Sequence, residues 1–256
     1  MQEEKPADPT REQETERVVT NLNTAGLGAG GWGVARAGQP NWMVLHEADS
    51  AEALLGGAAI EPARRLVRVC AVDGPAIVLG STQPLSDIVE RPEVPVVRRR
   101  SGGGAVWVSP GDPVWVDVVV PSGDPLAQSD VGRAFFWLGD AWAAALTDLG
   151  VADLEVHRGP LIRTPLSAVV CFAGLGPGEV RAGGRKVVGL AQRRTRAGAL
   201  FQCAVVLWWD PAPLVSALAM TTDDRLDAEA ALEATVTGIG DLDAEEVVAA
   251  FLRHLP

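Results

Sequence analysis

Residues 98–106 read Arg98-Arg99-Arg100-Ser101-Gly102-Gly103-Gly104-Ala105-Val106, and they follow an apolar run at residues 94–97 that predicts a short buried strand. Glycine tolerates positive φ, so successive backbone N–H groups in this turn can converge on one anion. Arginine adds a planar fork of donors that suits a carboxylate or a phosphate. The stretch predicts an anion-binding turn, and a plain Gly-rich hairpin beside solvated arginines is the alternative.

A second stretch reads Gly183-Gly184-Arg185-Lys186-Val187-Val188-Gly189. The glycine pair predicts a hairpin turn, after which Lys186 begins an alternating strand. Lys186 and Lys5 are the only lysines of the chain, against 20 arginines. An ammonium is more compact than a guanidinium, so a lysine in this place suggests a function. The alternative is an ordinary strand lysine, and in either case we expect its side chain at a solvated site.

Together the two stretches resemble the lipoate-protein ligase and octanoyltransferase family, a branch of the biotin and lipoate ligase superfamily. The family pattern Arg-Arg-x-Ser/Thr-Gly-Gly-Gly-Ala-Val is met by Arg98, Arg99, Ser101, Gly102, Gly103, Gly104, Ala105 and Val106. Its second pattern, Gly-Arg-Lys-hydrophobic-x-Gly-x-Ala, is met from Gly184 to Ala191. The resemblance covers roughly residues 40 to 255 and implies the fold of the biotin and lipoate ligase catalytic domains.

For a ligase, the resemblance implies ATP and Mg²⁺ as cofactors and lipoate or octanoate as substrate. The acyl group would be activated as an acyl-adenylate and passed to a lysine of a lipoyl carrier domain. Positive charge and fixed backbone amides would stabilise the charge that develops in both steps. The implied roles are Lys186 bridging acyl carbonyl and phosphate, Arg99, Ser101, Gly103 and Gly104 holding the carboxyl and phosphate end, Gly189 and Ala191 lining the nucleotide, and Glu179 near the metal.

An apolar tunnel for an eight-carbon chain is also required, since each buried CH₂ contributes about 0.8 kcal/mol. Candidate walls are Val78, Leu79, Trp107 and Trp115.

A rival chemistry uses no ATP and takes the acyl group from acyl carrier protein. One octanoyltransferase branch of the family holds the acyl group as a thioester on a cysteine in a Cys-Phe context. Cys171-Phe172 lies 15 residues before Lys186, so Cys171 is a candidate nucleophile whose thiolate nearby cations would favour. The alternative is a buried strand over residues 168–172, with Cys171 packed as a small hydrophobe.

A third hypothesis is a ligand-binding homologue without turnover. Val108 stands where the family usually has a histidine after the glycine motif. Only a short segment follows Met220, so we expect the C-terminal accessory domain of larger ligases to be absent. That expectation favours a transferase, a ligase with a separate accessory chain, or a binder.

The net charge of −11 is concentrated near the two ends, while arginines gather at residues 98–100 and 193–196. A basic site in an acidic chain argues against nucleic-acid binding and fits an anionic small molecule or a small acidic carrier protein. Cys70, Cys171 and Cys203 have no metal-ligand spacing and predict reduced thiols. With no signal peptide or apolar span of roughly 18 residues, we expect a cytoplasmic protein without a membrane segment.

The predicted fold is α+β, with a mixed, mostly antiparallel sheet flanked by helices. Residues 1–38 predict a disordered acidic and Gly-rich leader, and residues 39–256 the catalytic domain. We expect the strands on either side of the glycine turn to pair with a strand at residues 115–120. Other expected strands cover 66–72, 76–80, 154–157, 168–172, 179–182, 186–192 and 200–208, and expected helices cover 51–55, about 130–149 and 243–255.

Overall fold

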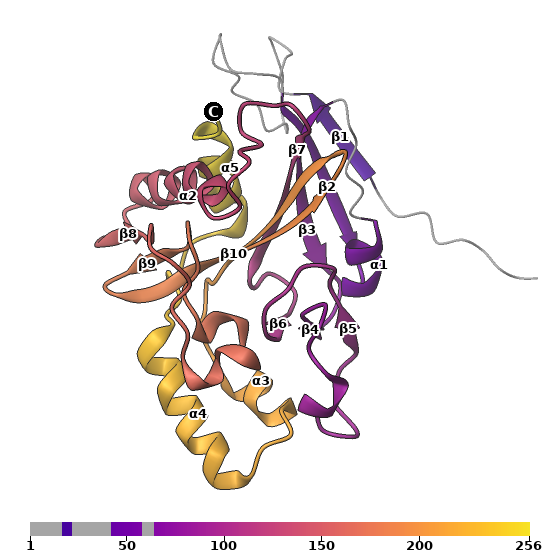
Figure 1. The fold of residues 1–256 in the computed structure, drawn as a ribbon, viewed down its shortest axis with the longest axis vertical. Helices are drawn as coiled ribbons and strands as arrows, with labels where there is room; N and C mark the ends of the chain where they lie inside the picture. Colours follow the sequence, from indigo (N-terminus) through magenta and orange to yellow (C-terminus); the bar gives the residue numbers. More distant parts are fainter. Residues whose placement is uncertain (1–16, 22–41, 58–63) are drawn as a thin grey trace, which may run out of the picture.

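The computed structural model describes residues 17–21, 42–57 and 64–256 (Figure 1). Its main sheet has the strand order β1-β2-β3-β7-β11-β10-β9-β8. Neighbouring strands are antiparallel except β2 and β3, which are parallel. The strands are β1 Arg17–Asn21, β2 Trp42–Asp49, β3 Arg65–Val72, β7 Val114–Pro121, β8 Leu154–Val156, β9 Val180–Ala182, β10 Arg185–Thr195 and β11 Gly198–Val205. The predicted α+β class with a mostly antiparallel sheet is confirmed.

A second, three-stranded sheet has the order β5-β4-β6 and carries the glycine turn. Its strands are β4 Ala76–Leu79, β5 Val96–Arg98 and β6 Val106–Val108. The expected pairing of β5 and β6 with β7 is therefore wrong, because β4 takes the place between them and β7 pairs with β3 and β11. The glycine turn lies where the two sheets meet.

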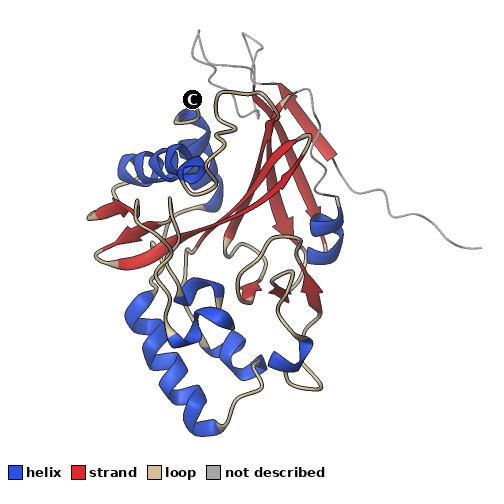
Figure 2. Cartoon of the chain, viewed as in Figure 1, coloured by secondary structure: helices blue, strands red, loops and turns tan. Residues whose placement is uncertain are grey.

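The helices form two groups (Figure 2). Helices α2 Phe136–Asp148 and α5 Ala244–Arg253 pack against the main sheet, and α3 Ala212–Ala217 and α4 Thr222–Thr235 lie at the other end, beyond the small sheet. Helix α1 Ala51–Gly56 follows β2. The sequence predicted α1, α2 and α5, and short 3-10 turns occupy Leu85–Asp87, Arg133–Phe135, Pro165–Ala168 and Cys171–Ala173.

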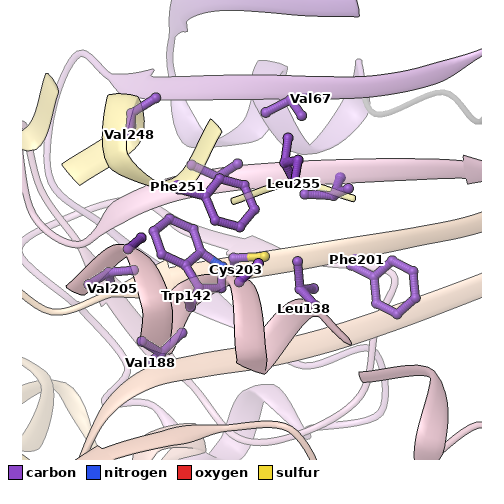
Figure 3. Close-up of a cluster of buried hydrophobic side chains, with 14 of the residues drawn as sticks. Val67, Leu138, Trp142, Val188, Phe201, Cys203, Val205, Val248, Phe251 and Leu255 are labelled. Carbon is purple, nitrogen blue, oxygen red and sulfur yellow. The ribbon is translucent and has the colours of Figure 1, made fainter. Parts of the chain in front are cut away.

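The largest core cluster lies between the main sheet and helices α2 and α5 (Figure 3). Trp142 stacks on Phe251 with ring centroids 3.9 Å apart, and both side chains are fully buried. Within α2, Leu138, Trp142 and Leu146 are buried, whereas Val131, inside the range expected for this helix, precedes it and is 57% exposed. This core holds β10 and β11, which carry the site.

Two backbone features set the start of β10. Gly183 and Gly184 form the predicted turn between β9 and β10, with φ of 54° and 82°, the left-handed region that glycine adopts without strain. A register shift between Lys186 and Val188 then marks a bulge. Because a bulge re-aims the side chains around it, Lys186 and Val187 can both be buried.

The predicted leader lies mostly outside the described residues, and its disorder stays a prediction there. Within it, Arg17–Asn21 forms β1, which pairs antiparallel with β2. No helix in the described ranges combines the length and apolar character needed to cross a membrane.

Candidate active site

The glycine turn packs directly against the segment that carries Cys171. The Ala105 N–H donates to the carbonyl of Val169 at 2.8 Å, and the Cys171 N–H donates to the carbonyl of Ala105 at 2.9 Å. A Cβ on Gly104 would lie 2.6 Å from the backbone nitrogen of Val170. The glycines thus allow two backbones to touch, a role beyond the anion cradle that the sequence predicts.

Gly103 brings a thiol and a guanidinium to the same place. Its φ is 100°, and the position that a Cβ would take lies 3.3 Å from Cys171 Sγ and 2.9 Å from Arg99 Nη2. A larger residue here would be strained and would also displace both groups. The absence of a side chain at Gly103 therefore sets a cation close to the Cys171 thiol.

The two arginines of the motif hold backbone carbonyls. Arg99 is 5% exposed and donates to the carbonyls of Val78, Gly102 and Gly104 at 3.2, 2.8 and 2.8 Å. Among the described residues, none accepts from its Nε. The exposed Arg98 donates to the carbonyls of Gly80 and Gln83. Their predicted roles toward a carboxylate or phosphate stay predictions. In this structure Arg99 braces the glycine turn, and Arg98 braces the segment that follows β4.

Ser101 joins the turn to the main sheet. The residue is 2% exposed, and its hydroxyl donates to Gln202 Oε1 at 2.8 Å. Gln202 lies on β11 and hydrogen-bonds in turn to Asp117 on β7. The serine of the motif therefore anchors the small sheet to the main one.

Lys186 is buried, with 2% of its surface exposed, so the expectation of a solvated lysine is wrong. Its Nζ lies 2.7 Å from Glu179 Oε2 and donates to the carbonyls of Gly174 and Cys171 at 3.0 and 3.3 Å. The ammonium also lies 4.8 Å from the centre of the Phe172 ring. These groups form what we term the lysine cluster. The ammonium of this cluster contacts the backbone of Cys171 and the ring of Phe172.

Glu179 completes the lysine cluster. Its Oε2 accepts from the Gly176 N–H at 2.6 Å, and its Oε1 accepts from the Leu190 N–H at 3.0 Å. Both carboxylate oxygens are therefore engaged. The described residues contain no group of three or more His, Cys, Asp or Glu side chains that could hold a metal ion. The predicted metal role of Glu179 stays a prediction.

Cys171 begins a 3-10 turn, Cys171–Ala173, and is half-buried. The expected strand at residues 168–172 is wrong, because the backbone of this segment bonds to the glycine turn through Ala105 instead of joining a sheet as a strand. Burial raises the pKa of Cys203 far above its usual range. Cys171 therefore differs from Cys203 in exposure and in its cationic neighbour.

A cavity of about 70 Å³ lies between the two sheets and is lined almost entirely by apolar groups. Arg99, Cys171, Gly189 and Ala191, which sequence reasoning named, lie on its wall, as do the expected wall residues Val78 and Trp115. Leu79 and Trp107, also expected there, do not line this cavity, and Trp107 lines a separate one. The remaining lining residues are Leu55, Val106, Val108, Pro113, Phe172, Leu190, Gln202, Cys203 and Ala204.

A second buried group of charges lies beside the cavity and was missed by sequence reasoning. Arg68 donates from Nη1 to Asp117 at 2.7 Å and from Nε to Glu47 at 3.1 Å, and all three side chains are at most 5% exposed. We term these three residues the arginine cluster. Burial, opposed mainly by the Arg68 charge, raises the pKa of Asp117 to about 6. Charged residues inside apolar strands were the available signal.

With this geometry in view, a family comparison decides the assignment. The sequence model described as "Lipoyl protein ligase A/B catalytic domain" matches residues 50–255. The chain belongs to this family.

Two curated relatives within the lipoyl protein ligase A/B family are octanoyltransferases LipM. The protein from Exiguobacterium sp. is 27% identical over 175 residues, which are 64% of this chain and 62% of the relative. The protein from Moorella thermoacetica is 31% identical over 163 residues, 61% of this chain and 59% of the relative. The match thus spans about three fifths of the length of each relative.

Solved structures with the same fold include lipoate-protein ligase A bound with ATP, at 20% identity and a TM-score of 0.58, covering 79% of this chain and 76% of that chain. A bipartite lipoate protein ligase from Thermoplasma acidophilum, solved with its E2 lipoyl domain, has 19% identity and a TM-score of 0.61. That match covers 79% of this chain and 74% of the other. At these identities the likeness establishes the fold of the catalytic domain.

Proposed function

We propose that the chain is an acyltransferase that moves an octanoyl or lipoyl group onto a lysine of a lipoyl carrier domain through a thioester on Cys171. The observation that carries this proposal is the position of the thiol. Cys171 lines the apolar cavity, and its Sγ and Arg99 Nη2 both lie within 3.3 Å of the point where a Gly103 side chain would stand. The nucleophilic sulfur of the proposed thioester thus lies beside a guanidinium donor and on the wall of an apolar cavity.

The chemistry divides into two exchanges. In the first, the Cys171 thiol gives up its proton as Sγ attacks the thioester carbonyl of an acyl carrier protein. The new bond forms to Sγ, the bond to the carrier sulfur breaks, and the carrier leaves as a thiol that has taken up that proton. In the second, the amine of the acceptor lysine attacks the Cys171 thioester, giving an amide and releasing the thiol. Splitting one difficult transfer into two such steps is the advantage of covalent catalysis.

The surroundings of Cys171 support both steps. Arg99 has an N–H donor on Nε that no described residue accepts, and we assign it to the oxyanion that forms on the acyl carbonyl. The lysine cluster fixes the backbone of Cys171 and Gly174 through Lys186. In this proposal Lys186 is a positioning residue, and it acts through its contacts with Glu179 and with the carbonyls of Cys171 and Gly174.

An ATP-dependent ligase reaction is the second candidate. It is favoured by the exposed guanidiniums of Arg98 and Arg100 beside the glycine turn, where a polyphosphate could bind. The described side chains do not form a ligand set for Mg²⁺, so we derive no step through the metal. On this route we propose a separate accessory chain as a partner, since one neighbour in fold is a bipartite ligase.

Intact-protein and peptide mass spectrometry after mixing with octanoyl-acyl carrier protein tests the first candidate. We expect one octanoyl group on the Cys171 peptide and none in Cys171→Ala. Cys203→Ala is the matched control, because Cys203 lines the same cavity but burial raises its pKa. An adduct that persists in Cys171→Ala contradicts the thioester route.

Pyrophosphate exchange with ATP, Mg²⁺ and lipoate or octanoate tests the second candidate. Exchange that survives in Cys171→Ala would establish the ligase reaction. If neither assay shows turnover, while calorimetry shows tight binding of an acyl-adenylate analogue, the chain is a binder.

A further inference from the structure

The floor of the cavity is a row of cross-strand neighbours whose size increases sharply at one end. Gly189 on β10 pairs with Ala204 on β11, and Ala204 pairs with Trp115 on β7. Directly paired residues point to the same face of a sheet. The first two side chains are small, so they leave a trough above β10 and β11, and the indole of Trp115 rises at its end.

The opposite end of the trough is closed by Phe172. A Cβ on Gly189 would lie 2.9 Å from the Phe172 ring, so the ring sits directly above this glycine. Cys171, the proposed nucleophile, is the preceding residue. Two strand spacings separate Gly189 from Trp115, about 10 Å. Cys171 and Trp115 line the same cavity, and an acyl chain laid along the trough from the Phe172 end meets Trp115 after a length close to that of an extended octanoyl group.

Trp115 is held in place by the arginine cluster. Its indole N–H donates to Asp117 Oδ1 at 2.8 Å, and Asp117 Oδ2 accepts from Arg68 at 2.7 Å. Arg68 is fixed further by Glu47 and by the carbonyl of Leu54 at 3.2 Å. Moving the indole would leave its buried N–H without an acceptor and would take one donor from the buried Asp117 carboxylate, which is costly. The wall is therefore rigid.

Space lies beyond this wall. A second, mostly apolar cavity of about 220 Å³ lies along β2, β3 and α5, and Trp115, Val108 and Pro113 line both cavities. These three residues separate the two spaces. Loss of the indole would extend the first cavity toward the second.

We propose that Trp115 determines the upper limit of acyl chain length, with the arginine cluster as the device that fixes its orientation. This inference rests on the proposed acyl transfer. It assigns to a residue outside both sequence motifs the selection of a medium-chain substrate.

The test compares Trp115→Leu and Trp115→Phe with the wild type on hexanoyl, octanoyl, dodecanoyl and palmitoyl thioesters of one carrier protein. We expect the ratio of kcat/KM for dodecanoyl to that for octanoyl to rise at least about tenfold in Trp115→Leu, since a few methylenes of pocket fit are worth that much. Trp115→Phe should give a smaller rise. Trp107→Leu on β6 of the small sheet is the matched control, because Trp107 lines a different cavity, and it should leave the ratio unchanged.

Calorimetric binding of the free fatty acids, performed in parallel, separates this inference from the proposed function. A shift in binding preference toward dodecanoate in Trp115→Leu supports the inference even where no transfer is seen. Transfer by both Trp115 variants with an unchanged chain-length profile overturns it, and an equal shift in Trp107→Leu does so as well. Circular dichroism shows which variants are folded. If Trp115→Leu is unfolded, the comparison of Trp115→Phe with the wild type is the test.

Discussion

The lysine cluster and the arginine cluster contact opposite ends of one cavity and differ in how their charges are balanced. In the lysine cluster one ammonium meets one carboxylate, and backbone amides and carbonyls of residues 171–190 satisfy the rest. In the arginine cluster one guanidinium meets two carboxylates from two other strands. The first holds a loop that carries the proposed nucleophile, and the second ties β2, β3 and β7 together beneath Trp115.

The difference shows how one site can hold both a loop, the Cys171 segment, and a cavity wall, Trp115, in fixed positions. One buried ammonium and one buried carboxylate balance each other, and local backbone groups can satisfy their remaining hydrogen bonds. Such a pair therefore fixes a single segment. Two carboxylates around one cation leave a surplus of negative charge in the core. Burial raises the pKa of Asp117, and the Glu47 charge adds to the rise while Arg68 opposes it. We expect the lysine cluster to be sensitive to truncation and the arginine cluster to be sensitive to pH.

The largest effect should follow from removing one partner of the lysine cluster. Lys186→Ala leaves Glu179 buried at 4% exposure without its cation, and the loss of one partner of a buried pair costs about 3–5 kcal/mol. Urea unfolding gives the free energy of unfolding directly. We also expect acyl transfer to be lost, because the Cys171 segment loses its anchor. An unfolding midpoint equal to that of the wild type would contradict this role.

The arginine cluster should affect how the free energy of unfolding depends on pH. Asp117 has a pKa raised from 3.8 to about 6, so between these values the folded state holds a proton that the unfolded state has released. The contribution of Asp117 to stability is therefore fully present below pH 3.8 and is lost as pH rises through about 6, by about 3 kcal/mol in all. Unfolding of wild type and Asp117→Asn at several pH values isolates this contribution. If the free energy of unfolding has the same slope against pH in both proteins, other groups compensate the surplus negative charge and the prediction for Asp117 is wrong.

A smaller effect should come from the contact between the glycine turn and the Cys171 segment. Gly104→Ala places a Cβ 2.6 Å from the backbone of Val170, which is overpacking worth about 1–3 kcal/mol, and it displaces the proposed nucleophile. Gly102→Ala is the matched control, since a Cβ there has no atom within 4 Å. Acyl transfer should fall in the first variant alone. Equal behaviour of the two would show that the close packing at Gly104 is unimportant.

The smallest effect is expected at an ion pair on the surface beside the lysine cluster. Arg181 is the cross-strand partner of Lys186 and pairs with Glu155 at 2.7 Å, but the two side chains are 27% and 62% exposed. Exposed pairs contribute about 0–1 kcal/mol, so Arg181→Ala should unfold close to the wild type. The contrast with Lys186→Ala tests burial as the cause, because the two positions are adjacent. A loss at Arg181 as large as that at Lys186 would refute this explanation.

Much of the fold was predictable because its signals are local. Alternating residues predicted β3 and β10, apolar runs predicted β7 and β11, the pair Gly183-Gly184 predicted the turn before β10, and residues 243–255 predicted α5. Helix α4 was not predicted, and few of its residues are buried. The segment 168–172 was predicted as a strand because it is apolar, yet its backbone partners lie in the glycine turn.

The sequence by itself determined which chemical groups the site contains, because glycine conformations, an isolated lysine and a Cys-Phe pair are properties of single residues and their spacing. Only the tertiary structure decided what those groups face. Lys186 is buried against Glu179, Arg99 braces the turn, and Trp115 is fixed by Asp117 and Arg68. The physical reason is that burial and ion pairing join residues far apart in the chain, and spacing along the sequence does not encode those distances.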